Sequence, residues 1–231
     1  MLILGMDTTA VTASVAVVEI DEKVRTYSLF SVKNRLTHSE MLMPMVKQAL
    51  DLYGAKPSDL NLIAVSVGPG SFTGVRIGVA TVKGLAFGLG KEMPCAAVST
   101  LEALAENLSQ QGGIVCPVMD ARRSQFYNAL FQDRQRLRKD RLIRAEELKE
   151  ELLSFGGPVT LCGDGADLFY ALCGELPNIK LASAASKDQN ALSVAVCGYR
   201  AFKENRLLTA KELKPVYLRA SQAEREKFGI E

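Results

Sequence analysis

The chain has 231 residues, of which 48% are hydrophobic and 23% are charged, with 28 basic and 26 acidic side chains. This is ordinary globular composition, and it excludes a disordered tail protein or a coiled coil. A formal net charge of +2 provides no overall field that would attract nucleic acid, so any RNA contact has to come from a local patch. The single histidine, His38, excludes a histidine-rich metal cluster.

The distribution of cysteines and apolar residues predicts a cytoplasmic protein with no membrane partner. The five cysteines are widely spaced, contain no Cys-x-x-Cys pair and follow no export signal, so we expect reduced thiols. The apolar N-terminus carries Asp7 and lacks a basic leader, so it predicts strands and not a signal peptide. No apolar run approaches the roughly 18–20 residues of a membrane span.

The first half of the chain predicts strands and amphipathic helices. Runs rich in Val, Ile, Leu and Thr indicate strands, and apolar residues at helical spacing indicate helices. The predicted elements are strands at Leu2–Gly5, Ala13–Val18 and Val24–Val32, a helix from the Thr37–Glu40 capping box to Gly54, a strand at Leu62–Val67, a helix at Val75–Leu89, a strand at Cys95–Val98 and a helix at Thr100–Leu108.

The second half opens in the same way, with a strand that ends in an aspartate and then a hairpin. The predicted elements are strands at Ile114–Met119 and Phe126–Phe131, a further strand, a helix at Ala145–Phe155, a strand at Val159–Cys162, and helices at Ala166–Leu176 and Asn190–Arg206. The parallel between Asp7 and Asp120 predicts an internal duplication in an α/β fold. We expect an N-terminal lobe at 1–110 and a C-terminal lobe at 111–231, whose last helix crosses back to the first lobe.

Two segments have the composition of an anion site. Asp7, Thr8 and Thr9 follow a buried strand, where they form either a phosphate and magnesium site or simply a hairpin turn. The glycine-rich stretch 68–74 precedes a helix, so it favours a turn that lets chains pass closely, with phosphate binding as the alternative. It contains no Walker motif.

Glycines and methionines stand out in the first two predicted helices. Interior glycine costs up to about 1 kcal/mol in helix propensity, so Gly74, Gly78, Gly84 and Gly88 indicate that another segment approaches closely. That segment is either the sheet of the same chain or a partner, and the sequence weights the two equally. Methionines such as Met41, Met43 and Met45 suit partner surfaces, although they are more often found in cores.

The run Arg134–Arg144 is basic and lies in a predicted hairpin. A solvated edge strand protected by charge is the favoured interpretation, and contact with RNA phosphates is the alternative. His38 stands in the first turn of a predicted helix, where we expect a capping or interface role and not a catalytic one.

Taken together, several segments resemble one family. They are Leu2–Thr9, Thr37–Glu40, Val67–Gly78, Val98–Leu104 and Pro215–Arg219. Over essentially its whole length the chain resembles the TsaB family, also called YeaZ, with the glycine-rich segment as the most specific part. The resemblance implies a duplicated, two-lobed fold of the actin, sugar kinase and Hsp70 ATPase type, which is ribonuclease H-like.

The resemblance also implies a function and partners. Members are similar to TsaD, which transfers a threonylcarbamoyl group to the adenosine next to the tRNA anticodon, and serve as its non-catalytic partner together with TsaE. We therefore expect a TsaD homologue and a TsaE homologue as partners, a homodimer when the chain is alone, and contact with tRNA only through the complex. The implied interface lies on the first two helices, at Leu36, His38, Met41, Met45, Gly74, Val75, Gly78, Val79 and Val82.

The chain departs from TsaD at the metal motif. Aligning Glu102 with the glutamate of the TsaD histidine motif puts Thr100 and Leu104 where the two histidines would be. Neither side chain replaces a metal ligand, so we expect no metal and no catalytic residues.

Nucleotide binding is expected to be weak. The glycine-rich nucleotide segment of TsaD is reduced to Gly163-Asp164-Gly165, so we expect no tightly bound cofactor and at most weak binding of ATP or ADP with magnesium. Its candidate residues are Asp7, Thr8, Thr9 and Asp120. The alternative function is an ATP-dependent kinase or ATPase of the same fold, with Asp7 and Asp120 around magnesium.

Overall fold

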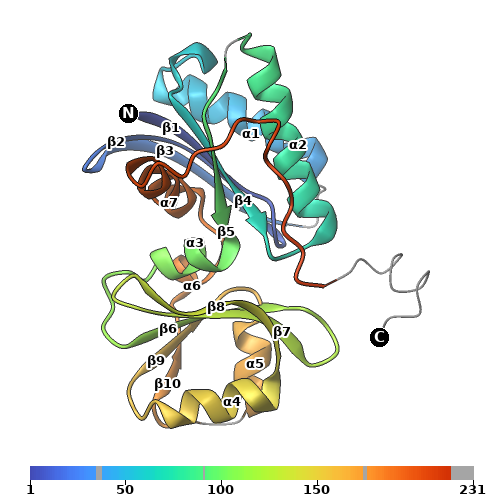
Figure 1. The fold of residues 1–231 in the computed structure, drawn as a ribbon, viewed down its shortest axis with the longest axis vertical. Coiled ribbons are helices and arrows are strands. Elements are labelled where there is room, and N and C mark those ends of the chain that lie inside the picture. Colours follow the sequence, from blue (N-terminus) through green and yellow to red (C-terminus); the bar gives the residue numbers. More distant parts are fainter. Residues whose placement is uncertain (35–37, 91, 174–175, 220–231) are drawn as a thin grey trace, which may run out of the picture.

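The chain forms two lobes, each built around one five-stranded sheet (Figure 1). The computed structural model describes residues 1–34, 38–90, 92–173 and 176–219. Leu36 and Thr37, which were predicted to begin the partner interface and the first capping box, lie outside the described residues.

The first sheet has the strand order β3-β2-β1-β4-β5. Its strands are β1 (Leu2–Asp7), β2 (Thr12–Asp21), β3 (Lys23–Lys33), β4 (Leu62–Gly68) and β5 (Cys95–Ser99). The helices of this lobe are α1 (His38–Tyr53), α2 (Phe72–Gly88), α3 (Thr100–Glu106) and α7 (Ala191–Lys203), with a 3-10 turn at Pro57–Asp59. Leu4 and Met6 of β1 pack into one core with α1 and α2, while Ile3 packs into another with α7. Period-two alternation thus places helices on both faces of the sheet.

The second sheet repeats this topology. Its strands are β6 (Ile114–Asp120), β7 (Gln125–Gln132), β8 (Gln135–Arg144), β9 (Val159–Cys162) and β10 (Ile179–Leu181), in the order β8-β7-β6-β9-β10. The helices are α4 (Ala145–Ser154), α5 (Ala166–Cys173) and the short α6 (Ala184–Lys187). In both sheets the first strand pairs antiparallel with the second and parallel with the fourth. The duplicated two-lobed α/β fold predicted from the sequence is confirmed.

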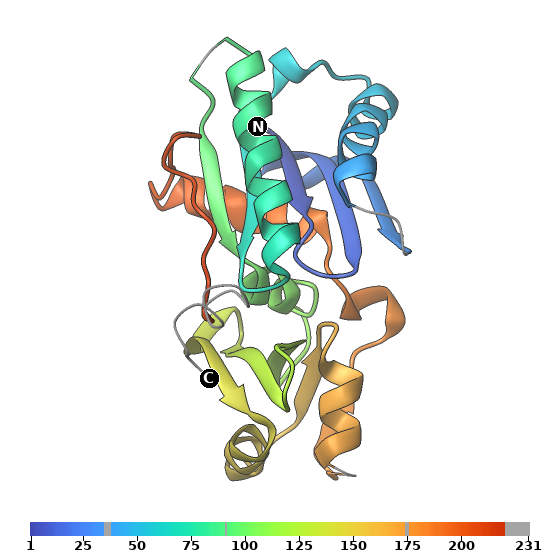
Figure 2. The same cartoon turned by 90° about the vertical axis from the view of Figure 1, so that its right-hand side faces the viewer.

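Up to the end of α7, the chain passes between the lobes twice. The first passage, from α3 to β6, contains the predicted boundary at 110/111, and α7 then returns to the first sheet (Figure 2). Leu101 and Leu104 of α3 form a core with Val115 and Met119 of β6, so the lobes share apolar contacts. After α7, residues 207–219 form an extended segment, the C-terminal strap, in which the Val216 amide donates to the Val67 carbonyl at 2.7 Å.

Several predicted bounds need correction. The second helix begins at Phe72 and not at Val75, because the Ser71 hydroxyl accepts a hydrogen bond from the Gly74 amide at 3.3 Å and so caps it. The fifth helix ends at Cys173 among the described residues, and the last ends at Lys203, three residues before the predicted end. The short elements β10 and α6 were not predicted, because three or four residues carry too little periodicity.

The glycine-rich segment 68–74 lets chains pass closely. A Cβ atom on Gly70 would lie 2.5 Å from the Thr9 carbonyl oxygen, and one on Gly74 would lie 2.0 Å from that of Thr8. Gly68, whose φ is +117°, has no room for a Cβ beside the Val216 carbonyl, at 2.4 Å. The segment therefore holds α2 against the β1–β2 turn on one side and the C-terminal strap on the other.

Replacing a glycine of α2 with alanine should have opposite effects on stability at two positions of the helix. Gly74→Ala should lower the free energy of unfolding by about 1–3 kcal/mol or more, because the added methyl group overlaps backbone. A methyl group on Gly84 would meet no atom within 4 Å, so Gly84→Ala should raise stability by about 0.5–1 kcal/mol. Urea denaturation of both variants measures the difference. Equal changes in the two would contradict the close packing at Gly74.

Candidate functional site

A cleft of about 710 Å³ lies between the lobes. The first lobe lines it with Thr9, Ala10, Val11, Asn34, His38, Gly70 and Ser71, and the second with Met119, Asp120, Ala121, Arg122, Tyr127 and Asp164. Two of the four predicted nucleotide residues, Thr9 and Asp120, are thus in its wall.

Asp7 and Thr8, the other two, are buried in hydrogen bonds of the turn. One carboxylate oxygen of Asp7 accepts from the Thr9 amide at 2.8 Å and hydroxyl at 2.7 Å, and the other accepts from the Ser66 hydroxyl. The Thr8 hydroxyl donates to the Gly74 carbonyl at 2.7 Å. Burial raises the pKa of Asp7, although the bonds from Ser66 and Thr9 lower it. Neither side chain has exposed surface, and in this structure both organise the turn.

Asp120 repeats the turn of Asp7 in the second lobe. One carboxylate oxygen of Asp120 accepts from the Arg122 amide at 2.7 Å, just as Asp7 accepts from the amide two residues on. The other oxygen forms an ion pair with the Arg122 guanidinium at 3.2 Å. The two lobes therefore share even this hydrogen bond from the amide two residues later to the aspartate. Of the two aspartates, however, only Asp120 is open to the cleft.

Asp164 is the acidic group of the cleft with the strongest perturbation. Its side chain is open to the cleft, yet the surrounding protein raises the pKa of its carboxyl to about 6 by desolvation. The nearby carboxylates of Asp120 and Asp188 add to this rise in pKa, and Lys33 opposes it.

The raised pKa of Asp164 predicts a pH dependence of stability. Because the carboxyl ionises near pH 6 in the folded chain and near 3.8 when unfolded, stability falls as the pH rises between these values. Asp164→Asn removes that loss, so its stability relative to the wild type should grow from about pH 4 to about pH 6 and then stay constant. Urea midpoints of both proteins across this range measure it. A constant difference at all pH values would contradict the raised pKa.

The third helix carries no metal motif. Thr100 and Leu104, at the two positions compared with histidines, are fully buried, and Leu104 belongs to the core between the lobes. Within the part of the chain that the structure describes, no group of three or more His, Cys, Asp or Glu side chains has the arrangement of a metal site. All five cysteines are buried and free.

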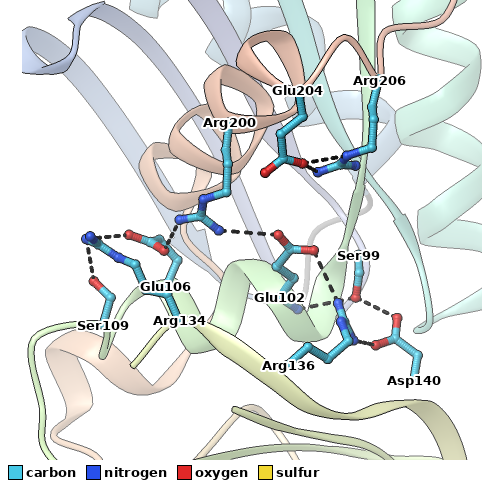
Figure 3. A network of polar contacts seen from close by, with 10 residues as sticks. All are labelled: Ser99, Glu102, Glu106, Ser109, Arg134, Arg136, Asp140, Arg200, Glu204 and Arg206. Carbon is cyan, nitrogen blue, oxygen red and sulfur yellow. Dashed lines mark hydrogen bonds and ion pairs between the residues drawn. The ribbon is translucent and has the colours of Figure 1, made fainter. Parts of the chain in front are cut away.

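Glu102 belongs instead to an ion-pair network around α3 (Figure 3). Its carboxylate contacts Arg136 of β8 at 3.2 Å and Arg200 of α7 at 3.4 Å. Glu106, one turn later, contacts Arg200 at 2.7 Å and Arg134 at 3.1 Å. The network joins both lobes through the two glutamates of α3.

These ion pairs also bear on the basic run Arg134–Arg144, for which the sequence allowed either a charged edge strand or contact with RNA phosphates. β8 is an edge strand, which confirms the favoured interpretation of Arg134–Arg144. Most of its arginines are neutralised within the chain, because Arg136 also pairs with Asp140, and both Arg138 and Arg141 pair with Glu151 of α4. Partnered charges of this kind release few counterions on binding RNA, so the structure does not favour the alternative.

Two arginines of this region should differ in their effect on stability. Glu106 is only 7% exposed, so Arg200→Met leaves a buried carboxylate with one partner fewer and should cost about 1–3 kcal/mol. Arg206 pairs with the half-exposed Glu204, so Arg206→Met should cost less than about 1 kcal/mol. Urea denaturation tests both variants. An equal cost would show that burial of Glu106 has no role.

Most residues predicted for the partner interface face inward. Met45, Val79 and Val82 are buried in the core that α1 and α2 form with the sheet, as is Val75 in α2. The apolar stripe of an amphipathic helix indicates the core first, and here this rule overrides the partner interpretation. In the single chain these side chains therefore offer little or no surface to a partner.

The remaining predicted interface residues have structural contacts as well. Gly74 and Gly78 let α2 approach Thr8, whose hydroxyl would lie 2.8 Å from a Cβ on Gly78. His38 Nε2 donates to the Ala10 carbonyl at 2.6 Å, and Met41 is half-buried against the core. The sequence left open whether a partner or the chain's own sheet approaches these glycines. For Gly74 and Gly78 the structure shows that the segment that approaches belongs to the same chain.

The opposite sides of the two helices are exposed and carry apolar groups. Phe87 is 90% exposed and Leu52 is 67% exposed, which is unusual for side chains of this size. We call the exposed side of α2 the docking face, and it consists of Ala80, Lys83, Gly84 and Phe87, which share one side of the helix at helical spacing. In the sequence, Gly84 is the residue that indicates this face. Gly84 lies outside the buried stripe of α2, so packing against the sheet does not explain why a glycine stands there.

Comparisons with known proteins agree over almost the whole chain. A family model described as TsaD, tRNA N6-adenosine threonylcarbamoyltransferase, matches residues 34–227. The tRNA threonylcarbamoyladenosine biosynthesis protein TsaB of Bacillus subtilis is 34% identical over 97% of this chain and 96% of that protein. TsaB of Escherichia coli is 30% identical over the full length of both chains.

Solved structures support the same relationship. A crystal structure of YeaZ from Pseudomonas aeruginosa superimposes with a TM-score of 0.78 at 26% identity, over 94% of this chain and 100% of that one. A second structure from the same organism, described as similar to the peptidase YeaZ, gives 0.79 over 94% and 99%. In the described ranges no helix has the length and apolar character needed to cross a bilayer.

Proposed function

The chain belongs to the TsaB family of tRNA threonylcarbamoyladenosine biosynthesis proteins, and we propose that it is a non-catalytic subunit that binds a TsaD homologue. The observation that carries this proposal is a TsaD-like chain whose third helix has no place for a metal. A TsaE homologue joins the assembly, and the modified substrate is the adenosine next to the tRNA anticodon. We place the protein in the cytoplasm, where these reactions meet their tRNA.

The third helix supports the non-catalytic role. Thr100 and Leu104 occupy buried positions at the two sites compared with the TsaD histidines, and Glu102 is held by two arginines. Without imidazole ligands the chain lacks the Lewis acid that would orient and polarise a substrate. The kinase alternative receives no support, because both carboxylate oxygens of Asp7 are engaged by Thr9 and Ser66.

The docking face supports the choice of surface. It presents the exposed ring of Phe87 together with the small residues Ala80 and Gly84, which let a second backbone approach. Exposed apolar groups of this size mark interaction surfaces. The same face remains exposed when the chain is alone, so we propose that it then forms a homodimer. The TsaD homologue and a second copy of the chain therefore compete for the docking face.

One substitution tests the docking face directly. Gly84→Arg puts a bulky charge on it and should abolish complex formation with the TsaD homologue, because no neighbouring atom lies within 4 Å to take up the side chain internally. Light scattering of the mixed proteins measures the complex. Gly78 is unsuitable for the same test, since a side chain there meets Thr8 and Val65 inside the fold.

Gly112→Arg is the matched control. Gly112 lies in the exposed loop between α3 and β6, also with no atom within 4 Å, so this variant should bind like the wild type. Circular dichroism of both variants verifies the fold. A complex that forms equally well with Gly84→Arg would exclude the docking face, and no complex with the wild type would exclude the proposed function.

A further inference from the structure

The C-terminal strap brings an aromatic ring to the N-terminal end of α2. Tyr217 stacks on Phe72 with ring centroids 4.7 Å apart and an angle of 27° between the planes. The guanidinium carbon of Arg76 lies 5.1 Å from the centroid of Phe72. Tyr217 is 42% exposed and Phe72 is 36% exposed, so two large rings are held in place at the surface. Figure 1 shows the strap, in red, crossing in front of α2 toward the junction of the lobes.

The strap then reaches the second lobe beside a turn with unusual backbone geometry. Arg219 donates from Nη1 to the Ala121 carbonyl at 2.6 Å. The next three residues, Arg122, Arg123 and Ser124, all have positive φ, of 67°, 57° and 54°. Such conformations cost roughly 1 kcal/mol or more per non-glycine residue, and they cluster at functional sites.

This turn presents arginines to solvent. The Arg122 side chain is 86% exposed and lines the cleft, and Arg123, the next residue, is exposed as well. Together with Arg76 and Arg219 they bring positive charge from three segments distant in sequence to one surface. Arg122 forms an ion pair with Asp120, but its own side chain stays largely in solvent. In β8, by contrast, Arg136 and Arg141 pair with carboxylates while only 28% exposed, so less of their charge faces solvent.

We propose that this surface, consisting of Phe72, Arg76, Arg122, Arg123, Tyr217 and Arg219, binds a single-stranded stretch of RNA. Guanidinium groups bind phosphates, and stacked aromatic rings accept unpaired bases, so the combination is typical of single-strand recognition. A protein partner is less well matched, since the surface offers several cations and only two rings. The inference rests on the proposed function: the RNA is the tRNA that the assembled complex modifies.

The surface also lies next to the docking face on α2. Phe72 and Arg76 belong to its first turns, and Ala80, Gly84 and Phe87 follow along the same helix. A TsaD homologue on the docking face would therefore stand beside the RNA-binding surface. RNA held there would be shared by the two subunits, and this explains why tRNA is engaged by the complex.

Fluorescence anisotropy with a labelled tRNA anticodon stem-loop tests the arginines, using the complex with the TsaD homologue at several salt concentrations. Arg122→Ser/Arg123→Ser should weaken binding at least about fivefold and flatten the slope of log affinity against log salt by about 1.4, or about 0.7 for each phosphate that is no longer bound. Lys23→Ser/Lys56→Ser removes the same charge from the opposite end of the first sheet and should change neither value.

Tyr217 tests the stacking separately. Tyr217→Ala should weaken binding about tenfold without changing the salt slope, whereas Tyr217→Phe keeps the ring and should bind like the wild type. Circular dichroism verifies the folds. Unchanged binding by both the arginine and the Tyr217→Ala variants, or an equal loss in the lysine control, would overturn the proposal.

The two proposals fail in different ways. Light scattering reports complex formation independently of RNA, and if the wild type forms no complex, the same titrations on the chain alone decide the RNA inference. If Arg122→Ser/Arg123→Ser loses the complex while the chain alone keeps its RNA affinity, the surface binds protein and the RNA inference is wrong. Gly84→Arg should show the converse, with the complex lost and RNA binding by the chain retained.

Discussion

The close contact between the glycine-rich segment and the β1–β2 turn determines the position of everything around it. Backbone touches backbone at Gly70 and Gly74, where a Cβ would lie 2.5 Å or less from the carbonyl oxygens of Thr9 and Thr8. The contact fixes α2 on the sheet and buries its valine stripe. With one side of α2 committed in this way, the other side faces solvent. The docking face and the first part of the RNA-binding surface therefore follow from the absence of two side chains.

The two lobes show how a duplicated turn acquires different properties. Asp7 and Asp120 make the same hydrogen bond to the amide two residues later. Ser66 and Thr9 close over Asp7, so that its carboxylate stabilises the turn and is withdrawn from solvent. Asp120 remains in the cleft wall with an arginine. An aspartate at a strand end is thus no evidence of a ligand site until its surroundings are known.

Local patterns predicted the fold well and the surfaces poorly. Strand composition and helical spacing located most elements and the duplication, since both depend on neighbouring residues. Several residues predicted for the interface are instead buried, because an apolar stripe such as Val75, Val79 and Val82 first indicates which side of a helix packs on the core. The ion pairs of the basic run also could not be predicted. Its partners Glu102 and Glu151 lie in other elements, and only the fold brings them to β8.

What distinguishes the arginines of this protein is therefore how far they are exposed and not their number. Those of β8 are used to hold α3 and α4, so substituting them would change stability before it changed binding. Those of the β6–β7 turn stand on a strained backbone, 86% exposed in the case of Arg122, and contribute little to the packing. A run of three such residues at an exposed turn is consistent with a ligand role, since backbone strain clusters at functional sites. A single-stranded anion, which can reach across the strap, the turn and α2, is the ligand whose charge and shape fit this position.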